Sequence, residues 1–206
     1  YQPKTKGDPQ QIASLVDAIE NAKKPLFYTG GGVINSGPNA SKLLRELVDG
    51  TNFPITSTLM GLGCYPASGK RWLGMLGMHG NYAPNKLTNE CDVLIAVGMR
   101  FDDRVTGDLS RYAQQAKVIH LEIDPAEVDK NVKTDVAVLG DAKESLLALC
   151  QYLKSNRHDA WLERFRALEF QEYTEVIEID LNEIKEPLLA CPNDPDDIKP
   201  LSEVAN

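Results

Sequence analysis

Glycine-rich segments recur along the chain, each close to a short apolar run. They are residues 30–32, 61–63 and 74–80, with the single glycines Gly98 and Gly140. Glycine has no Cβ, so its backbone N–H groups can approach a phosphate closely, and the N-terminus of a following helix adds partial positive charge. A turn from a strand to a helix needs glycine even where no ligand binds, so the fold by itself explains each segment taken singly. Taken together, the segments favour a long, diphosphate-containing ligand.

Charged residues of both signs surround one aromatic residue in the sequence Arg100-Phe101-Asp102-Asp103-Arg104. This segment directly follows an apolar run, where a ligand of a parallel sheet would lie. Two arginines can pair with the two aspartates and still offer donors to a phosphate or a carboxylate. A solvated turn held by salt bridges explains the same residues equally well, so both interpretations stay open.

Side chains that could act in catalysis or bind a metal are scarce. The three histidines, His79, His120 and His158, are far apart, and no Ser/His/Asp, Cys/His or metal-ligand spacing accompanies them. His79 lies between glycines, and ligand contact is slightly favoured there over a structural role. The first apolar run is not followed by G-x-G-x-x-G, and no acid ends the run at residues 55–57. An ordinary nicotinamide dehydrogenase is therefore disfavoured.

The elements that must position these residues alternate between helix and strand. A helix is expected after the Asp8-Pro9 cap, and a second one from Pro38 to Asp49, ended by Gly50. Asp124 and Asp141 are expected to cap two further helices. Apolar runs predict strands at 25–28, 54–57, 92–97, 117–123 and 136–139. The pattern predicts an α/β fold: a doubly wound, mostly parallel sheet with helices on both faces.

Length and charge predict one domain with an appendage. Residues 171–206 hold ten of the 30 acids and two of the 22 bases, together with four of the 12 prolines, so the preceding part is neutral. The expected division is an N-terminal linker and helix (1–24), a central α/β domain (25–156), an edge helix (157–173) and an acidic, proline-containing linker (174–206). Because it begins at Tyr1 rather than Met, the chain is expected to be a piece of a longer or processed polypeptide.

Composition excludes several classes of protein. The formal net charge of −8 argues against a nucleic-acid partner, and no apolar run approaches the roughly 18 residues of a membrane span. The four cysteines are far apart and form no C-x-x-C pair. They predict reduced thiols. The expected location is the cytoplasm, or the stroma or matrix of an organelle in a eukaryote.

Several motifs in a fixed order resemble the central domain of the acetolactate synthases (acetohydroxyacid synthases), a family of thiamine-diphosphate enzymes. They are GGG (30–32), STLMGLG (57–63), LGMHG (76–80), GMRFDDRVTG (98–107) and GD (140–141). The string RFDDR beside STLMGLG is the specific part, and the resemblance covers nearly the whole chain. It implies that this chain is the middle of three domains. The flanking domains would bind thiamine diphosphate and Mg²⁺, and the Gly-Asp-Gly motif of that site does not occur here.

The resemblance further implies the activity of the parent enzyme and its partners. Such enzymes condense two pyruvates, or pyruvate and 2-oxobutyrate, with loss of CO2, in the biosynthesis of isoleucine and valine. The expected partners are the flanking domains of the same polypeptide, further copies in a homo-oligomer and a regulatory small subunit. The chain alone is expected to be inactive and to contain no catalytic residue. A cofactor-free scaffold domain of another thiamine-diphosphate enzyme is the alternative.

In that family the middle domain holds FAD, which has a structural rather than a redox role. Carried over by motif, the FAD contacts would be Gly31, Thr58, Leu59, Leu76, Gly77, Met78, His79, Gly98, Met99, Arg100, Phe101, Asp102, Glu122, Ile123, Asp141 and Ala142. Asp103 and Arg104 resemble the pair that faces the substrate channel, where inhibitors bind. Glu122 stands where the family usually has Asp, which could move a ribose contact by one methylene.

Overall fold

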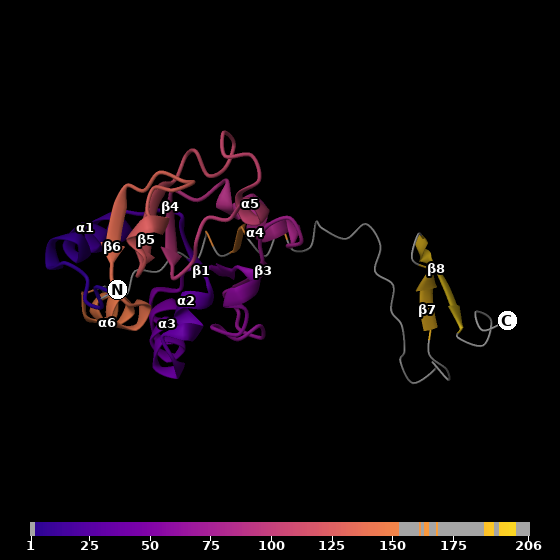
Figure 1. The fold of residues 1–206 in the computed structure, drawn as a ribbon, viewed down its shortest axis with the longest axis horizontal. Helices are drawn as coiled ribbons and strands as arrows, with labels where there is room; N and C mark the ends of the chain where they lie inside the picture. Colours follow the sequence, from indigo (N-terminus) through magenta and orange to yellow (C-terminus); the bar gives the residue numbers. More distant parts are fainter. Residues whose placement is uncertain are drawn as a thin grey trace. The chain divides into compact units, whose positions relative to one another are not determined.

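The computed structural model describes residues 3–152, Trp161, Glu163, Arg164 and Leu168, and the backbone of residues 188–191 and 194–200. A sheet of six strands, all parallel, forms the centre of the first part (Figure 1). In their order across the sheet the strands are β3 (Trp72–Met75), β2 (Ile55–Ser57), β1 (Pro25–Thr29), β4 (Val93–Val97), β5 (Lys117–Glu122) and β6 (Val136–Leu139). The predicted α/β fold is confirmed.

Helices connect the strands. They are α1 (Pro9–Glu20), α2 (Gly31–Asn35), α3 (Pro38–Thr51), α4 (Tyr82–Thr88), α5 (Asp103–Thr106) and α6 (Ala142–Tyr152), with the 3-10 turns η1 (Leu59–Gly61) and η2 (Pro125–Glu127). Side chains alternate along each strand, so the sheet has a core on each face. Phe27 of β1 packs in the core that includes residues of α1, α3 and α6. Its neighbours Leu26 and Tyr28 pack in the other, which includes α4.

Aspartate caps hold two of the predicted helix starts. Asp8 Oδ1 accepts a hydrogen bond of 2.8 Å from Gln10 N at the start of α1, and Asp141 Oδ1 accepts one of 2.9 Å from Lys143 N in α6. The third Asp cap behaves differently. Asp124 Oδ1 accepts from Ala126 N at 2.9 Å, but only the single 3-10 turn η2 follows, because the chain turns extended at Val128.

The predicted end of α3 at Gly50 is wrong. The helix continues through Gly50 to Thr51, and Asn52 then adopts the left-handed conformation with φ of 59°. The Asn52 N–H donates to Val48 O at 2.9 Å, which closes the last turn. Asparagine tolerates a left-handed backbone better than most residues, so it can take the place usually held by glycine.

The described residues after Tyr152 belong to two units of the chain. Trp161, Glu163, Arg164 and Leu168, which fall within the predicted edge helix at 157–173, have helical backbone, and the rest of that range lies outside the described residues. The buried Trp161 donates from Nε1 to Pro25 O at 3.0 Å, and Arg164 pairs with Glu90 at 3.0 Å. These contacts hold that segment to the α4 side of the sheet.

A small antiparallel sheet forms in the second unit, within the range predicted to be a linker (174–206). Strand β7 (Leu188–Cys191) pairs with β8 (Asp194–Pro200). Proline is tolerated in β8 because each strand of a two-stranded sheet has a free edge, so alternate N–H groups need no partner. Among the described residues, no helix has the length and apolar character that crossing a membrane requires.

Candidate functional site

The candidate site lies where the order of the strands reverses. Connections run outward from β1 through β2 to β3 in one direction, and from β4 through β5 to β6 in the other. In such sheets a crevice opens beyond the carboxyl ends of the strands at this point. A pocket of about 670 Å³ is found there, lined by residues that follow β1, β2, β4, β5 and β6. Its volume lies within the range of small-molecule sites, roughly 300–1,000 Å³.

Many of the residues predicted as ligand contacts line this pocket. They are Gly31, Thr58, Leu59, Gly98, Met99, Arg100, Asp102, Glu122, Ile123, Asp141 and Ala142, and Arg104 of the predicted substrate-channel pair joins them. Gly32 and Gly140, from the glycine segments predicted to bind a diphosphate-containing ligand, also line it, as do residues that were not predicted as contacts: Asn35, Ser36, Met60, Val105, Leu121, Asp124 and Glu127.

The remaining predicted contacts lie outside the pocket lining. Leu76 and Phe101 are buried in the core, each 3% exposed, and the Phe101 ring packs edge-on against the rings of Tyr28 and His120. Residues 77–79 follow β3, which is one of the two edge strands of the sheet. They reach only the rim of the pocket, where Met78 N donates to Arg104 O at 2.9 Å.

Residues 77–79 are held beside the rim. Asn85 accepts from Gly77 N at 2.9 Å and donates to Gly77 O at 3.1 Å. The side chains of Met78 and His79 are exposed. Asp103, the other predicted channel residue, is exposed at the first turn of α5 and does not line the pocket.

Backbone of the turns after β1 and β4 meets beneath the pocket. Gly32 N donates to Gly98 O at 2.8 Å, and a Cβ on Gly32 would lie 2.7 Å from Gly98 Cα. A Cβ on Gly30 would lie 2.3 Å from Met99 Cβ. Gly98 itself has a φ of +57°. These glycines are therefore required by the contact between two turns, a reason that does not depend on any ligand.

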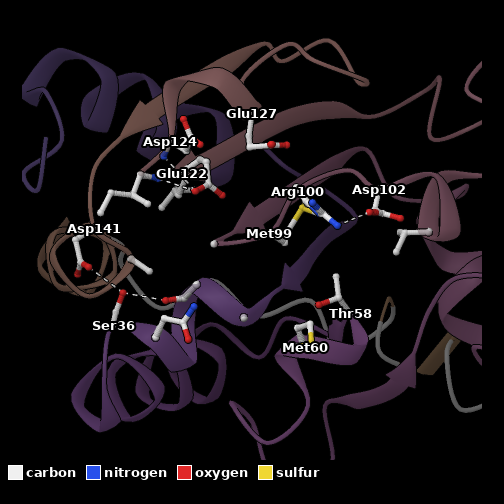
Figure 2. A pocket seen from close by; sticks show the side chains of 18 of the residues that line it. Ser36, Thr58, Met60, Met99, Arg100, Asp102, Glu122, Asp124, Glu127 and Asp141 are labelled. Carbon is white, nitrogen blue, oxygen red and sulfur yellow. Dashed lines mark hydrogen bonds and ion pairs between the residues drawn. The ribbon is translucent and has the colours of Figure 1, made fainter. Parts of the chain in front are cut away.

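Charged side chains are unevenly distributed around the pocket. Figure 2 shows Arg100 and Asp102 on one side, near Thr58 and Met60, with Asp141 on the opposite side. Arg100 Nη2 pairs with Asp102 Oδ2 at 2.8 Å, and its side chain is 66% exposed. A hydrogen bond from Arg104 N is the main cause that lowers the pKa of Asp102. The guanidinium groups of Arg100 and Arg104 act in the same direction.

On the side of the pocket opposite Arg100, the carboxylate of Glu122 accepts hydrogen bonds from nearby backbone N–H groups, and that of Asp141 accepts one from Ser36. Glu122 Oε1 accepts from Ile123 N at 2.9 Å and from Asp124 N at 3.3 Å. Asp141 Oδ2 accepts from Ser36 Oγ at 2.9 Å, while its other oxygen caps α6 (Figure 2). Each carboxylate keeps lone pairs for a further donor, because an ionised carboxylate has about four acceptor sites.

A further residue behind the pocket is His120, which lies in the strand predicted at 117–123 and was not predicted as a contact. It is fully buried, and its Nε2 lies 2.7 Å from Met99 O and 3.8 Å from Glu122 Oε2. Its contact with Met99 could not be derived from spacing, because Met99 follows a different strand, β4. Within the described residues, no three His, Cys, Asp or Glu side chains are grouped to hold a metal ion.

Comparison with known proteins finds one matching family and several similar proteins. The family described as "Thiamine pyrophosphate enzyme, central domain" matches residues 12–149. The "Probable acetolactate synthase large subunit" of Methanocaldococcus jannaschii is 47% identical over 171 residues, which are 82% of this chain and 29% of that protein. The "Acetolactate synthase large subunit" of Parasynechococcus marenigrum is 49% identical over 157 residues, 74% of this chain and 25% of that protein.

A third relative has a similar extent of match. The "Acetolactate synthase isozyme 3 large subunit" of Escherichia coli is 40% identical over 166 residues, 81% of this chain and 29% of that protein. The chain thus spans less than a third of the length of these relatives.

Proposed function

The chain belongs to the family of thiamine pyrophosphate enzyme central domains, as its motifs predicted, and we propose that it is the FAD-holding central domain of an acetolactate synthase. The observation that carries this proposal is the pocket, which runs along the carboxyl ends of five parallel strands and has Arg100, paired with Asp102, on one side and the carboxylates of Glu122 and Asp141 on the other. A dinucleotide needs both features, because its phosphates attract guanidinium groups and its hydroxyls donate to carboxylates.

The residues present fit such a ligand in three ways. Arg100, with its mostly exposed guanidinium, can pair with the diphosphate without giving up a buried contact. Glu122, at the end of β5, keeps acceptor capacity for sugar hydroxyls. Leu59 and Met60 line the pocket with side chains that are 68% and 73% exposed, and these can pack against a flat ring system. FAD bound here would be structural and supply no redox step.

The activity of the parent enzyme is part of the proposal. We propose that it condenses two pyruvates, or pyruvate and 2-oxobutyrate, with loss of CO2. Thiamine diphosphate and Mg²⁺ would be held by domains that this chain does not contain. A homo-oligomer and a regulatory small subunit are the proposed partners, since the relatives are named large subunits. The cytoplasm, or the organelle compartment of a eukaryote, is the proposed location.

Titration of the 206-residue chain with FAD tests whether this domain binds the cofactor. We expect flavin fluorescence to be quenched and the melting temperature to rise, with ADP competing and NAD competing poorly. Arg100→Gln should weaken FAD binding about tenfold, because a hydrogen bond to a charged group contributes about 1.5 kcal/mol or more. Arg111→Gln, at an exposed arginine outside the pocket lining, is the matched control and should bind as the unchanged chain does.

A cofactor-free scaffold domain is the second candidate function. The pairing of Arg100 with Asp102 and the hydrogen bonds of Glu122 to its own backbone favour it, because the pocket's charges are then satisfied without a ligand. Saturating FAD that changes neither fluorescence nor melting temperature would support the scaffold and reject the cofactor site.

A further inference from the structure

His120 is a polar side chain buried in the middle of the sheet. Its neighbours on β5, Ile119 and Leu121, pack in the core with α1, so His120 points to the opposite face. There its ring meets the ring of Phe101 edge-on, with centroids 5.2 Å apart and an interplanar angle of 68°. The side chain is 0% exposed. A buried polar ring in such surroundings is costly unless its nitrogens are used.

One ring nitrogen is used for a defined contact. Nε2 lies 2.7 Å from Met99 O, and since a carbonyl oxygen only accepts, Nε2 must carry the hydrogen. Met99 lies in the turn where the chain leaves the sheet. Gly98 N, directly after β4, donates to Leu121 O of β5 at 2.9 Å. The carbonyl of Met99 is held by a side chain instead.

The other ring nitrogen, Nδ1, is buried and has no hydrogen-bond partner in the described part of the chain. Burial lowers the pKa of His120, against the opposing effects of the bond to Met99 and of the carboxylates of Glu122, Glu127 and Asp129. The ring is therefore neutral near pH 7, with its single hydrogen on Nε2. This tautomer is the one that can hold Met99 O.

We propose that His120 is a positioning residue for the pocket: the hydrogen bond from Nε2 to Met99 O fixes the turn of residues 98–100, which forms one wall of the site. Met99 and Arg100 both line the pocket, so a displaced turn would move the Arg100 guanidinium away from a ligand phosphate. The positioning of the turn needs no ligand. The effect of the positioned turn on FAD binding rests on the proposed function.

Two substitutions of the 206-residue chain separate the roles of the two nitrogens. The amide nitrogen of glutamine reaches about the position of Nε2, whereas that of asparagine corresponds to Nδ1. The first measurement is hydrogen exchange of residues 98–101 without ligand. We expect His120→Gln to match the unchanged chain and His120→Asn to exchange at least about tenfold faster, while residues 93–97 stay protected in both.

The second measurement is FAD affinity, which His120→Asn should weaken about tenfold and His120→Gln should leave within about threefold. If all three proteins bind FAD equally and the turn exchanges equally, His120 only fills the core and the inference is overturned, while the proposed function stands. If none binds FAD but the exchange pattern is as expected, the positioning role stands and the FAD proposal fails.

A third measurement needs no variant and covers the case in which His120→Asn does not fold. In nitrogen NMR spectra of the unchanged chain, we expect His120 to show one hydrogen, on Nε2, between about pH 7 and 8. A hydrogen on Nδ1 instead would overturn the proposal, because Nε2 could not then donate to Met99 O.

Discussion

Alanine at Gly32 would force apart the two turns that form the base of the pocket. Gly32 is helical, so an alanine backbone fits there without strain. The added Cβ, however, would lie 2.7 Å from Gly98 Cα and 2.8 Å from Gly98 O. Both are backbone atoms, and Gly98 is held further by its hydrogen bond to Leu121 O. No flexible side chain can move aside to relieve the clash.

The expected cost of Gly32→Ala follows from this geometry. Overpacking by one methyl group typically destabilises by about 1–3 kcal/mol. For a domain of this size the melting temperature should fall by about 2–12 °C, at roughly 2–4 °C for each kcal/mol. Urea unfolding followed by circular dichroism measures the free energy of unfolding. If the slope of the free energy of unfolding against urea concentration is the same in both proteins, the substitution has changed the stability and not the surface that unfolding exposes.

Gly50→Ala is the matched control. Gly50 lies inside α3, and a Cβ there would meet no atom within 4 Å. Alanine in a helix is favoured over glycine by about 0.5–1 kcal/mol, so this variant should be more stable than the unchanged chain. The reasoning is refuted if Gly32→Ala is as stable as the unchanged chain, or if both variants change stability in the same direction.

Further predictions concern residues on the α4 side of the sheet. Trp161→Phe should lower the free energy of unfolding in urea by about 1–3 kcal/mol, because Pro25 O loses its donor; an unchanged midpoint would contradict this. Burial raises the pKa of Cys91 to about 12, so at pH 8 a thiol reagent should modify it only as fast as the chain unfolds, and rapid labelling of the native chain would argue against that burial. The hydrogen bond from Arg164 lowers the pKa of Glu90 from its ordinary 4.5, so the stability that this pair adds is present above pH 4.5 and is lost as the pH falls below it. Glu90→Gln should remove that part of the pH dependence; a variant whose stability falls with pH as steeply as before would reject the assignment.

Five of the six strands of the large sheet could be predicted from their apolar runs, the edge strand β6 among them, whereas the other edge strand, β3, could not. The strands β4 and β5 are nearly continuous apolar runs, and their residues are almost all buried. The strand β3 has four residues, one of them Gly74 with φ of +90°, and its pairing with β2 shifts register. Gly74 interrupts the apolar run, so this segment lacks the pattern by which a strand is recognised.

The candidate site could be predicted where it depends on strand ends, and not where it depends on contacts between distant side chains. Once a parallel sheet is expected, the ends of β4, β5 and β6 must share one edge. Ser36 and Asp141 are 105 residues apart, and nothing in the local sequence of either indicates their hydrogen bond. Residues 77–79 lie outside the pocket lining because their strand, β3, is at an edge of the sheet, a position that the local sequence does not indicate.

The contacts already made inside the pocket determine what a bound dinucleotide could gain there. Arg100 is paired with the carboxylate of Asp102, so a phosphate would replace that exposed ion pair, whereas Asp141 keeps acceptor sites beside the hydrogen bond from Ser36. By contrast, Leu59 and Met60 are mostly exposed, and burying such a side chain contributes about 1.5–3 kcal/mol. Affinity for a dinucleotide would therefore come from covering these two side chains together with the contact of Arg100, and the carboxylates would select which dinucleotide binds.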